Sequence, residues 1–131
     1  MAAIPALWYF VPVASLVALL SAYLFFRSMI KMPEGTSRMR EIAQYVKEGA
    51  FAYLSRQYKT VSIVFALLFL VFVVLAILGI QNPFVPIAFL TGGFFSGLCG
   101  FLGMKTATSA SSRTAAGAQS SLNKGLVIAF R

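Results

Sequence analysis

RMREIAQYVKEGAFAYLSRQYK, residues 38–59, is the stretch in which charged, aromatic and apolar residues are densely mixed, and long apolar runs lie on either side of it. We interpret it as an amphipathic helix with its weakest point at Gly49, because apolar residues recur in it at the helical period of 3.6. The residues on the apolar face are Met39, Ile42, Ala43, Val46, Ala50, Tyr53, Leu54 and Gln57. We expect this face, from Met39 to Leu54, to pack on helices that this chain does not contain.

The composition indicates a membrane protein. Of the 131 residues, 60% are hydrophobic and 11% are charged, whereas about a quarter of the residues in a soluble domain are charged. Lys and Arg number 11 against three acids, for a net charge of +8. Because the aromatic residues lie mostly inside the apolar runs, we interpret the charge as a signal of membrane topology and of attraction to anionic lipids, not of nucleic-acid binding.

Three apolar runs are long enough to cross a membrane, for which about 20 helical residues suffice. They cover residues 4–26, 61–80 and 84–104. The first run has no basic region before it and Arg27 directly after it, which favours a retained span over a cleaved signal peptide. Pro12 is expected to kink this span. No proline separates the amphipathic helix from the second run, so one helix can continue from Ser37 to Ile80.

The third run differs from the others in its content of small residues. Ala88, Gly92, Ser96 and Gly100 recur at every fourth position, and Gly93 and Gly97 form a second row. This spacing lets another helix approach closely, so we interpret the run as a packing helix. Cys99 is then a small core residue. GLCGFLGMKT, residues 97–106, is not a P-loop, because its Lys does not directly follow a Gly and no strand precedes it.

The remaining segments are a loop and amphipathic helix over 27–60, a small-residue segment over 105–124, and the truncated start of a fourth helix over 125–131. In the loop, turn residues surround Glu34, which could pair with Arg38, and Ser37 can cap the next helix. For 105–124 a flexible linker and a continued helix are both open. Its alanines and its lack of proline favour a helix over at least 106–119.

The distribution of positive charge predicts the orientation. Segment 27–60 holds seven Lys and Arg, the 81–83 turn holds none, and the tail after Met104 holds four. By the positive-inside rule, segments 27–60 and 105–124 are cytoplasmic, and the N-terminus and the turn are outside. Lys105 and Arg113 lie just past the third span and are interpreted as anchors to lipid heads. The alternative is a cation that faces an anionic substrate or a carboxylate of another helix.

No catalytic, cofactor-binding or metal-binding residue is predicted in this chain. Its acids are Glu34, Glu41 and Glu48, and the absence of Asp and His excludes a zinc site and a Ser-His-Asp triad within it. Glu41 and Glu48 lie near one helix face, but the cations around them disfavour a divalent metal ion. Two-metal phosphoryl transfer needs clustered carboxylates, and ion movement needs an ionisable group within the membrane, which the three runs lack.

Three stretches resemble the membrane-integral pyrophosphatases. RMREIAQYVKEGAFAYLSRQYKTV (38–61) resembles the segment before the second span of that family, GGFFSGLCGFLGMKTATSASSRTA (92–115) its third-span signature, and LNKGLVIAFR (122–131) the start of the next helix. The resemblance implies an all-α membrane protein, in which these three transmembrane helices and the cytoplasmic amphipathic helix form the N-terminal fragment of a bundle of about sixteen spans.

The resemblance also implies the activity. The family members are homodimeric pumps in the cell (inner) membrane that hydrolyse pyrophosphate with Mg²⁺, in some members with K⁺, and move H⁺ or Na⁺ outward. Their Asp-rich motifs are absent here, so no site residue is carried over, and Arg113 is given a structural role. EGTSRMREI (34–42) favours the sodium-pumping, potassium-stimulated members.

The predicted function is therefore a structural segment of a pyrophosphate-energised ion pump, whose enzymatic activity belongs to the parent protein and not to this fragment. One alternative is a complete small three-span membrane protein that acts as an assembly or interaction subunit without enzymatic activity. Another is a membrane-surface or nucleic-acid binder that uses the basic helix.

Overall fold

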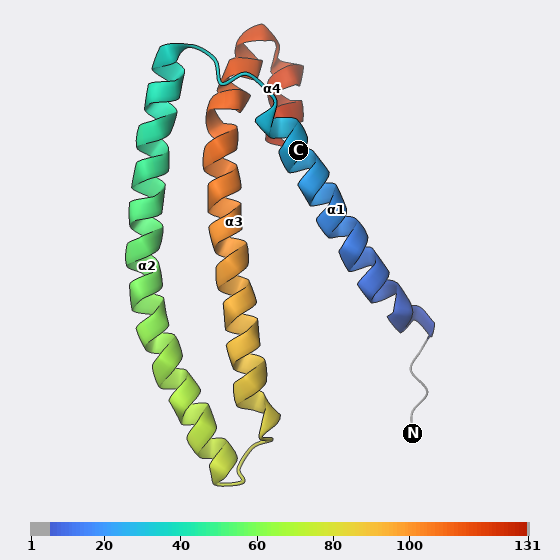
Figure 1. Cartoon of the computed structure of the whole chain (residues 1–131), viewed down its shortest axis with the longest axis vertical. Coiled ribbons are helices and arrows are strands. Elements are labelled where there is room, and N and C mark those ends of the chain that lie inside the picture. Colours follow the sequence, from blue (N-terminus) through green and yellow to red (C-terminus); the bar gives the residue numbers. More distant parts are fainter. Residues whose placement is uncertain (1–5, 131) are drawn as a thin grey trace. The chain divides into compact units, whose positions relative to one another are not determined.

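The chain is all-helical in the computed structural model, which describes residues 6–130 (Figure 1). A short 3₁₀ helix, η1 (Ala6–Tyr9), leads into α1 (Phe10–Ile30), and α2 (Ser37–Ile77), α3 (Phe84–Ser120) and α4 (Leu122–Ala129) follow. By length and composition α1, α2 and α3 can each cross a membrane. Ile4, Pro5 and Arg131, at the ends of two predicted segments, lie outside the described residues.

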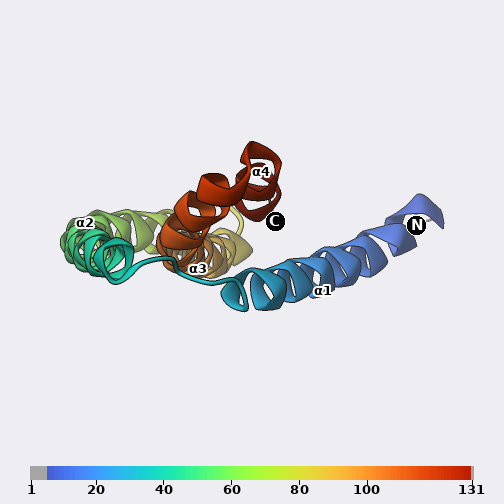
Figure 2. The same cartoon turned by 90° about the horizontal axis from the view of Figure 1, so that it is seen from above.

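The helices belong to two compact units. One unit combines residues 1–40 with 110–131, and so contains α1, the loop to α2, the end of α3 and α4. The other covers 41–109 and contains most of α2 and α3 with the turn that joins them. Within this second unit α2 and α3 run side by side (Figures 1 and 2).

The sequence left open whether one helix continues from Ser37 to Ile80; α2 is a single helix from Ser37, but it ends at Ile77. Gly79 takes a left-handed conformation with φ of +73°, which favours glycine. The Gly79 N–H donates to Ala76 O at 3.1 Å and the Ile80 N–H to Leu75 O at 3.0 Å. These bonds form a Schellman motif, which satisfies carbonyls at the end of the helix. The helix therefore ends just before Gly79, and the apolar pattern of the sequence did not indicate this end.

The start of α2 and the course of α1 also differ from expectation. The Thr36 hydroxyl, and not that of Ser37, accepts the Met39 N–H at 3.3 Å, and Ser37 is the first helical residue. Pro12 lies in the first turn of α1, where its missing N–H removes no intrahelical bond. α1 continues past Phe26 to Ile30.

Of the two alternatives for residues 105–124, the continued helix is confirmed. α3 runs without interruption through Thr106 to Ser120. Ser121 then turns to an extended conformation, and its hydroxyl accepts the Lys124 N–H at 3.1 Å. A serine in this position is a typical N-cap, so α4 begins at Leu122 and not at Gly125 as predicted.

Aromatic side chains join α2 to α3 within the 41–109 unit. The Phe65 and Phe89 rings stack with centroids 4.3 Å apart, and Phe72 meets Phe89 edge-on at 4.9 Å. Nearer the start of α2, Phe51 meets Phe101 at 5.9 Å. The apolar span within α2 is 0% buried inside this structure. Its other faces are therefore available to lipid or to further helices.

Candidate functional site

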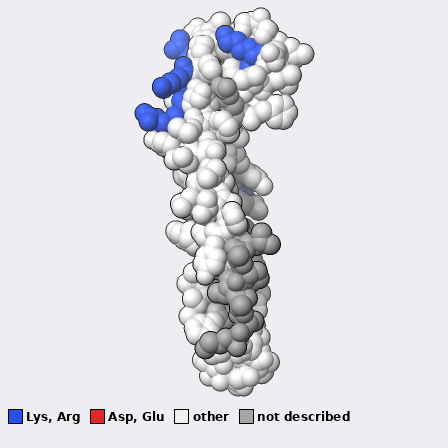
Figure 3. All heavy atoms as spheres, turned by 90° about the vertical axis from the view of Figure 1, so that its right-hand side faces the viewer, with Lys and Arg blue, Asp and Glu red and all other residues white. Residues whose placement is uncertain are grey.

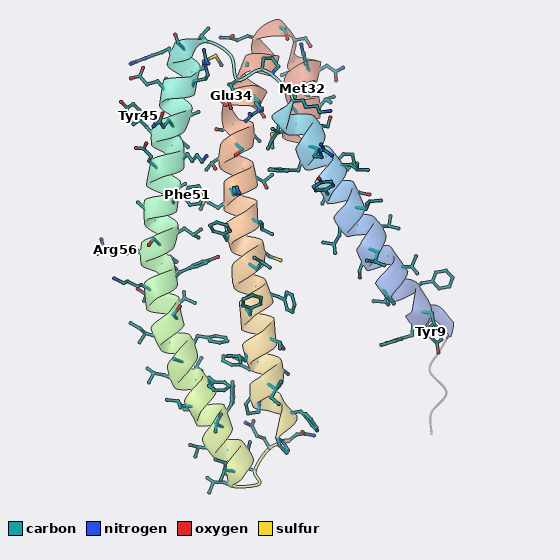
Figure 4. All side chains as sticks on the ribbon, in the orientation of Figure 1. Tyr9, Met32, Glu34, Tyr45, Phe51 and Arg56 are labelled. Carbon is teal, nitrogen blue, oxygen red and sulfur yellow. The ribbon has the colours of Figure 1, made fainter. Side chains whose placement is uncertain are left out.

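Arg113 is a nearly buried cation on α3, with a side chain only 11% exposed. Its Nη2 donates to Glu34 Oε1 at 2.7 Å, and its Nε donates to the Met32 carbonyl oxygen at 3.2 Å. Figure 4 shows Met32 and Glu34 beside the end of α3. Charge-assisted bonds of this kind are about twice as strong as neutral ones. Arg113 thus ties the loop between α1 and α2 to the end of α3, and we call this group of residues the arginine clamp.

Small residues let the loop approach α3 next to the arginine clamp. Gly35 has φ of +85°, and a Cβ built on it would lie 2.6 Å from Met39 Sδ and 3.1 Å from the Cβ of Ala116 on α3. Glycine is therefore required here both for its backbone conformation and for space.

The same end of α3 receives α4. A Cβ on Gly117 would lie 2.6 Å from Ile128 Cδ1, and a Cβ on Gly125 would lie 2.9 Å from Ala118 Cβ. Ile128 is only 3% exposed as a result. The small residues that looked like a linker in the sequence are thus the contact surface for the loop and for α4.

These contacts bear on two interpretations of the sequence. Arg113 is not a lipid-head anchor, because it is buried against Glu34; the alternative of a carboxylate partner is right, although that carboxylate lies on a loop. Glu34, for which the sequence suggested the neighbouring Arg38 as a partner, bonds to Arg113, 79 positions away. The scarcity of acids could have indicated this pair, because the sequence has only three carboxylates for 11 Lys and Arg residues.

A second cluster lies between α2 and α3 in the 41–109 unit. The Tyr58 hydroxyl donates to the Gly97 carbonyl oxygen at 2.5 Å. A Cβ on Gly100 would lie 2.9 Å from that hydroxyl, and a Cβ on Gly93 would collide with the Phe65 ring. The predicted close packing is therefore confirmed at Gly93, in the second row, and at Gly100, in the first row, and the partner is α2. Sequence reasoning had not singled out Tyr58.

Each row also has a glycine that faces open space, since nothing lies within 4 Å of a Cβ built on Gly92 or on Gly97. Cys99 is exposed, so its predicted place in a core is wrong for this chain. A groove of about 1100 Å³ runs along this part of the unit, lined by Tyr58, Val61, Ser62, Phe65, Leu90, Thr91, Gly93, Phe94, Phe95, Ser96, Gly97 and Gly100.

The acids do not form a metal centre in the part of the chain that the structure describes. No group of three or more His, Cys, Asp or Glu side chains that could hold a metal ion occurs among residues 6–130. Glu48 accepts a hydrogen bond from the Gln44 side chain at 2.9 Å. The two clusters above can therefore hold helices together, and neither is a set of Mg²⁺ ligands.

The chain is similar to a family of membrane enzymes. A family profile described as "Inorganic H+ pyrophosphatase" matches residues 16–131. The chain is 58% identical over 126 residues to the "Putative K(+)-stimulated pyrophosphate-energized sodium pump" of Bacteroides thetaiotaomicron. It is 43% identical over 121 residues to the "K(+)-insensitive pyrophosphate-energized proton pump 2" of Moorella thermoacetica. It is 35% identical over 125 residues to the "K(+)-stimulated pyrophosphate-energized sodium pump" of Thermotoga maritima.

These alignments cover most of this chain but little of each relative. They span 95%, 92% and 93% of the chain, and 17%, 17% and 16% of the three relatives in the same order. No solved structure matches the chain.

Proposed function

The chain belongs to the inorganic H⁺ pyrophosphatase family, and from this premise we propose that it is a segment of a multi-pass membrane pump that couples pyrophosphate hydrolysis to the movement of H⁺ or Na⁺. The observation that carries the proposal is the 58% identity, over 95% of the chain, to a relative named as a pyrophosphate-energized sodium pump. The chain spans 17% of that relative. The catalytic residues are therefore expected in other parts of the polypeptide.

The role of this segment is to insert, to set the topology and to support the catalytic helices. Mg²⁺-pyrophosphate needs several carboxylates to hold the metal ions. The described residues do not fit such a site, because they contain no cluster of three potential metal ligands. The arginine clamp and the contact between Tyr58 and Gly97 instead fix the C-terminal end and the middle of α3.

The orientation follows from the basic residues. Figure 3 shows Lys and Arg side chains, in blue, at the surface. Segments 27–60 and 105–124 carry ten of the 11 Lys and Arg and lie in the cytoplasm, with the N-terminus and the turn near Gly79 on the outside. The complete pump is a homodimer of about sixteen-span subunits in the cell (inner) membrane, with this chain as its N-terminal part.

The percentage of sequence identity does not decide whether the protein moves H⁺ or Na⁺. The proton pump of Moorella thermoacetica is 43% identical and the sodium pump of Thermotoga maritima is 35% identical. The 58% relative and the EGTSRMREI wording favour Na⁺ with stimulation by K⁺.

The test uses inverted membrane vesicles that contain the complete protein with these residues. We expect Mg²⁺-pyrophosphate to drive uptake of ²²Na⁺, and K⁺ to raise the rate. Quenching of a pH-sensitive dye without ²²Na⁺ uptake would assign H⁺ instead. No pyrophosphate-driven uptake of either ion would overturn the proposal. As a control, the 131-residue segment alone is expected to show no Mg²⁺-dependent pyrophosphate hydrolysis above background.

A further inference from the structure

The part of α2 that precedes its apolar span has three distinct faces. Residues near Phe51 and Tyr58 face α3, as the ring contact of Phe51 and the hydrogen bond of Tyr58 show. A polar face that borders it carries the exposed residues Gln44 and Glu48, which are bonded to each other at 2.9 Å. The third face, which we call the outer face, consists of Ile42, Val46, Gly49 and Tyr53, spaced by four, three and four positions along the helix.

The outer face is apolar and uncovered. Ile42 is 52% exposed, Val46 49% and Tyr53 62%. Nothing lies within 4 Å of a Cβ built on Gly49, so the middle of this face has room for a close neighbour. In Figure 4, Tyr45, at the edge of this face, points away from α3 whereas Phe51 points toward it.

Lipid tails cannot cover this face along its length. The apolar run of α2 begins at Val61, directly after Lys59 and Thr60. At about 1.5 Å per residue, Val46 lies about 20 Å along the helix from Lys59. The polar headgroup layer on one side of a bilayer is only about 5–7 Å deep. Ile42 and Val46 therefore stand beyond the membrane, where an exposed apolar stripe calls for a protein partner.

We infer that the outer face of α2 is a docking surface for an apolar helix from another part of the same polypeptide, packed closely at Gly49 outside the membrane. The inference rests on the proposed function, because it needs the remaining length of the pump: the chain spans 17% of the 58%-identical relative. A small residue between larger ones is a typical feature of closely packed helix pairs. The occupant is thus a helix that presents a bulky apolar side chain opposite Gly49.

The first test is the reactivity of engineered cysteines in the complete protein, in inverted vesicles and with Cys99 replaced by Ala. Val46→Cys probes the outer face, and Gln44→Cys on the polar face is the matched control. We expect a membrane-impermeant maleimide to label Val46→Cys at least about tenfold more slowly than Gln44→Cys, because labelling of a packed interface requires local opening. Equal labelling rates would overturn the inference.

Two further readouts identify the occupant. In a mild detergent that keeps the protein folded, the labelling rate of Val46→Cys could rise to the rate of the control. That result would mean that lipid covers the outer face, and it would overturn the inference. A disulfide-linked dimer of Val46→Cys on oxidation would place a second copy there and would also overturn it. Protection in both vesicles and detergent, without a dimer, supports a helix of the same polypeptide.

The second test fills the space at Gly49. Gly49→Leu in the complete protein is expected to lower the thermal midpoint of unfolding by about 1–2 °C, because the added side chain collides with the docked helix. Gln44→Leu, five positions away on the polar face, is expected to shift it by less than about 0.5 °C. A raised midpoint for Gly49→Leu, as expected from helix propensity alone, would overturn the inference. Pyrophosphate-driven transport is measured separately, so that failure of the proposed function can be told from failure of the docking surface.

Discussion

At the scale of single residues, the arginine clamp shows how one cation can join distant parts of the chain. Arg113 uses its Nε for the Met32 carbonyl and its Nη2 for Glu34. The rigid fork of the guanidinium makes both bonds possible at once, which a lysine ammonium cannot reproduce. The clamp therefore depends on the shape of the arginine as well as on its charge.

Arg113→Lys in the complete protein is expected to lower the free energy of unfolding by about 1–2 kcal/mol, because the ammonium loses one of the two bonds and the packing of the planar group. Glu34→Gln is expected to cost about 1 kcal/mol, since an amide oxygen still accepts a bond and the Glu34 side chain is 42% exposed, which screens the pair. Chemical denaturation, monitored by circular dichroism, measures the free energy of unfolding of both variants. The double variant should cost less than the sum of the single costs; simple additivity would mean that the two residues do not interact.

The hydroxyl of Tyr58 gives a second prediction at this scale. Tyr58→Phe is expected to destabilise the protein by about 0.6–1.5 kcal/mol, the range for a hydrogen bond within a membrane protein. Gly100→Ala should cost more on its own, because its Cβ would lie 2.9 Å from the Tyr58 hydroxyl. In the Tyr58→Phe background that collision disappears, so Gly100→Ala should then be nearly neutral in thermal unfolding. An equal cost of Gly100→Ala in both backgrounds would show that the hydroxyl does not set the limit.

At the scale of elements, sequence reasoning succeeded where a pattern extends over many residues. Long apolar runs without an interrupting proline predicted helices where α2 and α3 lie. The rows of small residues in α3 predicted close packing. It failed at the helix ends. Single capping residues such as Gly79 and Ser121 determine that the helices end or begin at Ile77, Ser120 and Leu122. A cap acts locally, and its residue is easily overlooked in a stretch of apolar or small residues.

The arginine clamp could not be predicted for a different reason. Glu34 had a neighbouring cation in Arg38, and local pairing was the simpler interpretation. The true partner is 79 positions away, and only the tertiary fold brings it within 2.7 Å. Cys99 was misplaced because a position inside an apolar span does not say which face of the helix is covered.

The turn after α2 provides the prediction for this scale. Gly79→Ala is expected to cost about 1 kcal/mol of unfolding free energy, because alanine is strained at φ of +73°. Gly79→Asn should recover part of that loss, since asparagine tolerates the left-handed region. Thermal unfolding of the two variants against the parent protein decides. A cost that is equal for alanine and asparagine would indicate that the Schellman motif does not control this turn.

At the scale of the whole molecule, the family and the class of membrane protein could be inferred from the sequence, whereas the catalytic site could not. The resemblance of 38–61 and 92–115 to the pyrophosphatases is confirmed by the family match over 16–131. The residues that hold Mg²⁺ and pyrophosphate need clustered carboxylates, and this chain has three acids in all. The contribution proposed for this chain is therefore one of topology and packing.

The topology itself is the last prediction. Segment 27–60 carries seven Lys and Arg, and the turn near Gly79 carries none. Reversing the segment would move these cations to the outside, against the positive-inside rule. In a background with Cys99 replaced, Gln44→Cys and Gln119→Cys should react with an impermeant maleimide only in inverted vesicles, and Ile80→Cys only in intact cells. Labelling of Ile80→Cys from the same side as Gln44→Cys would contradict a single crossing by α2. Because α2 and α3 join at this turn, labelling of Gln119→Cys from the Gln44 side also checks that α3 returns to that side.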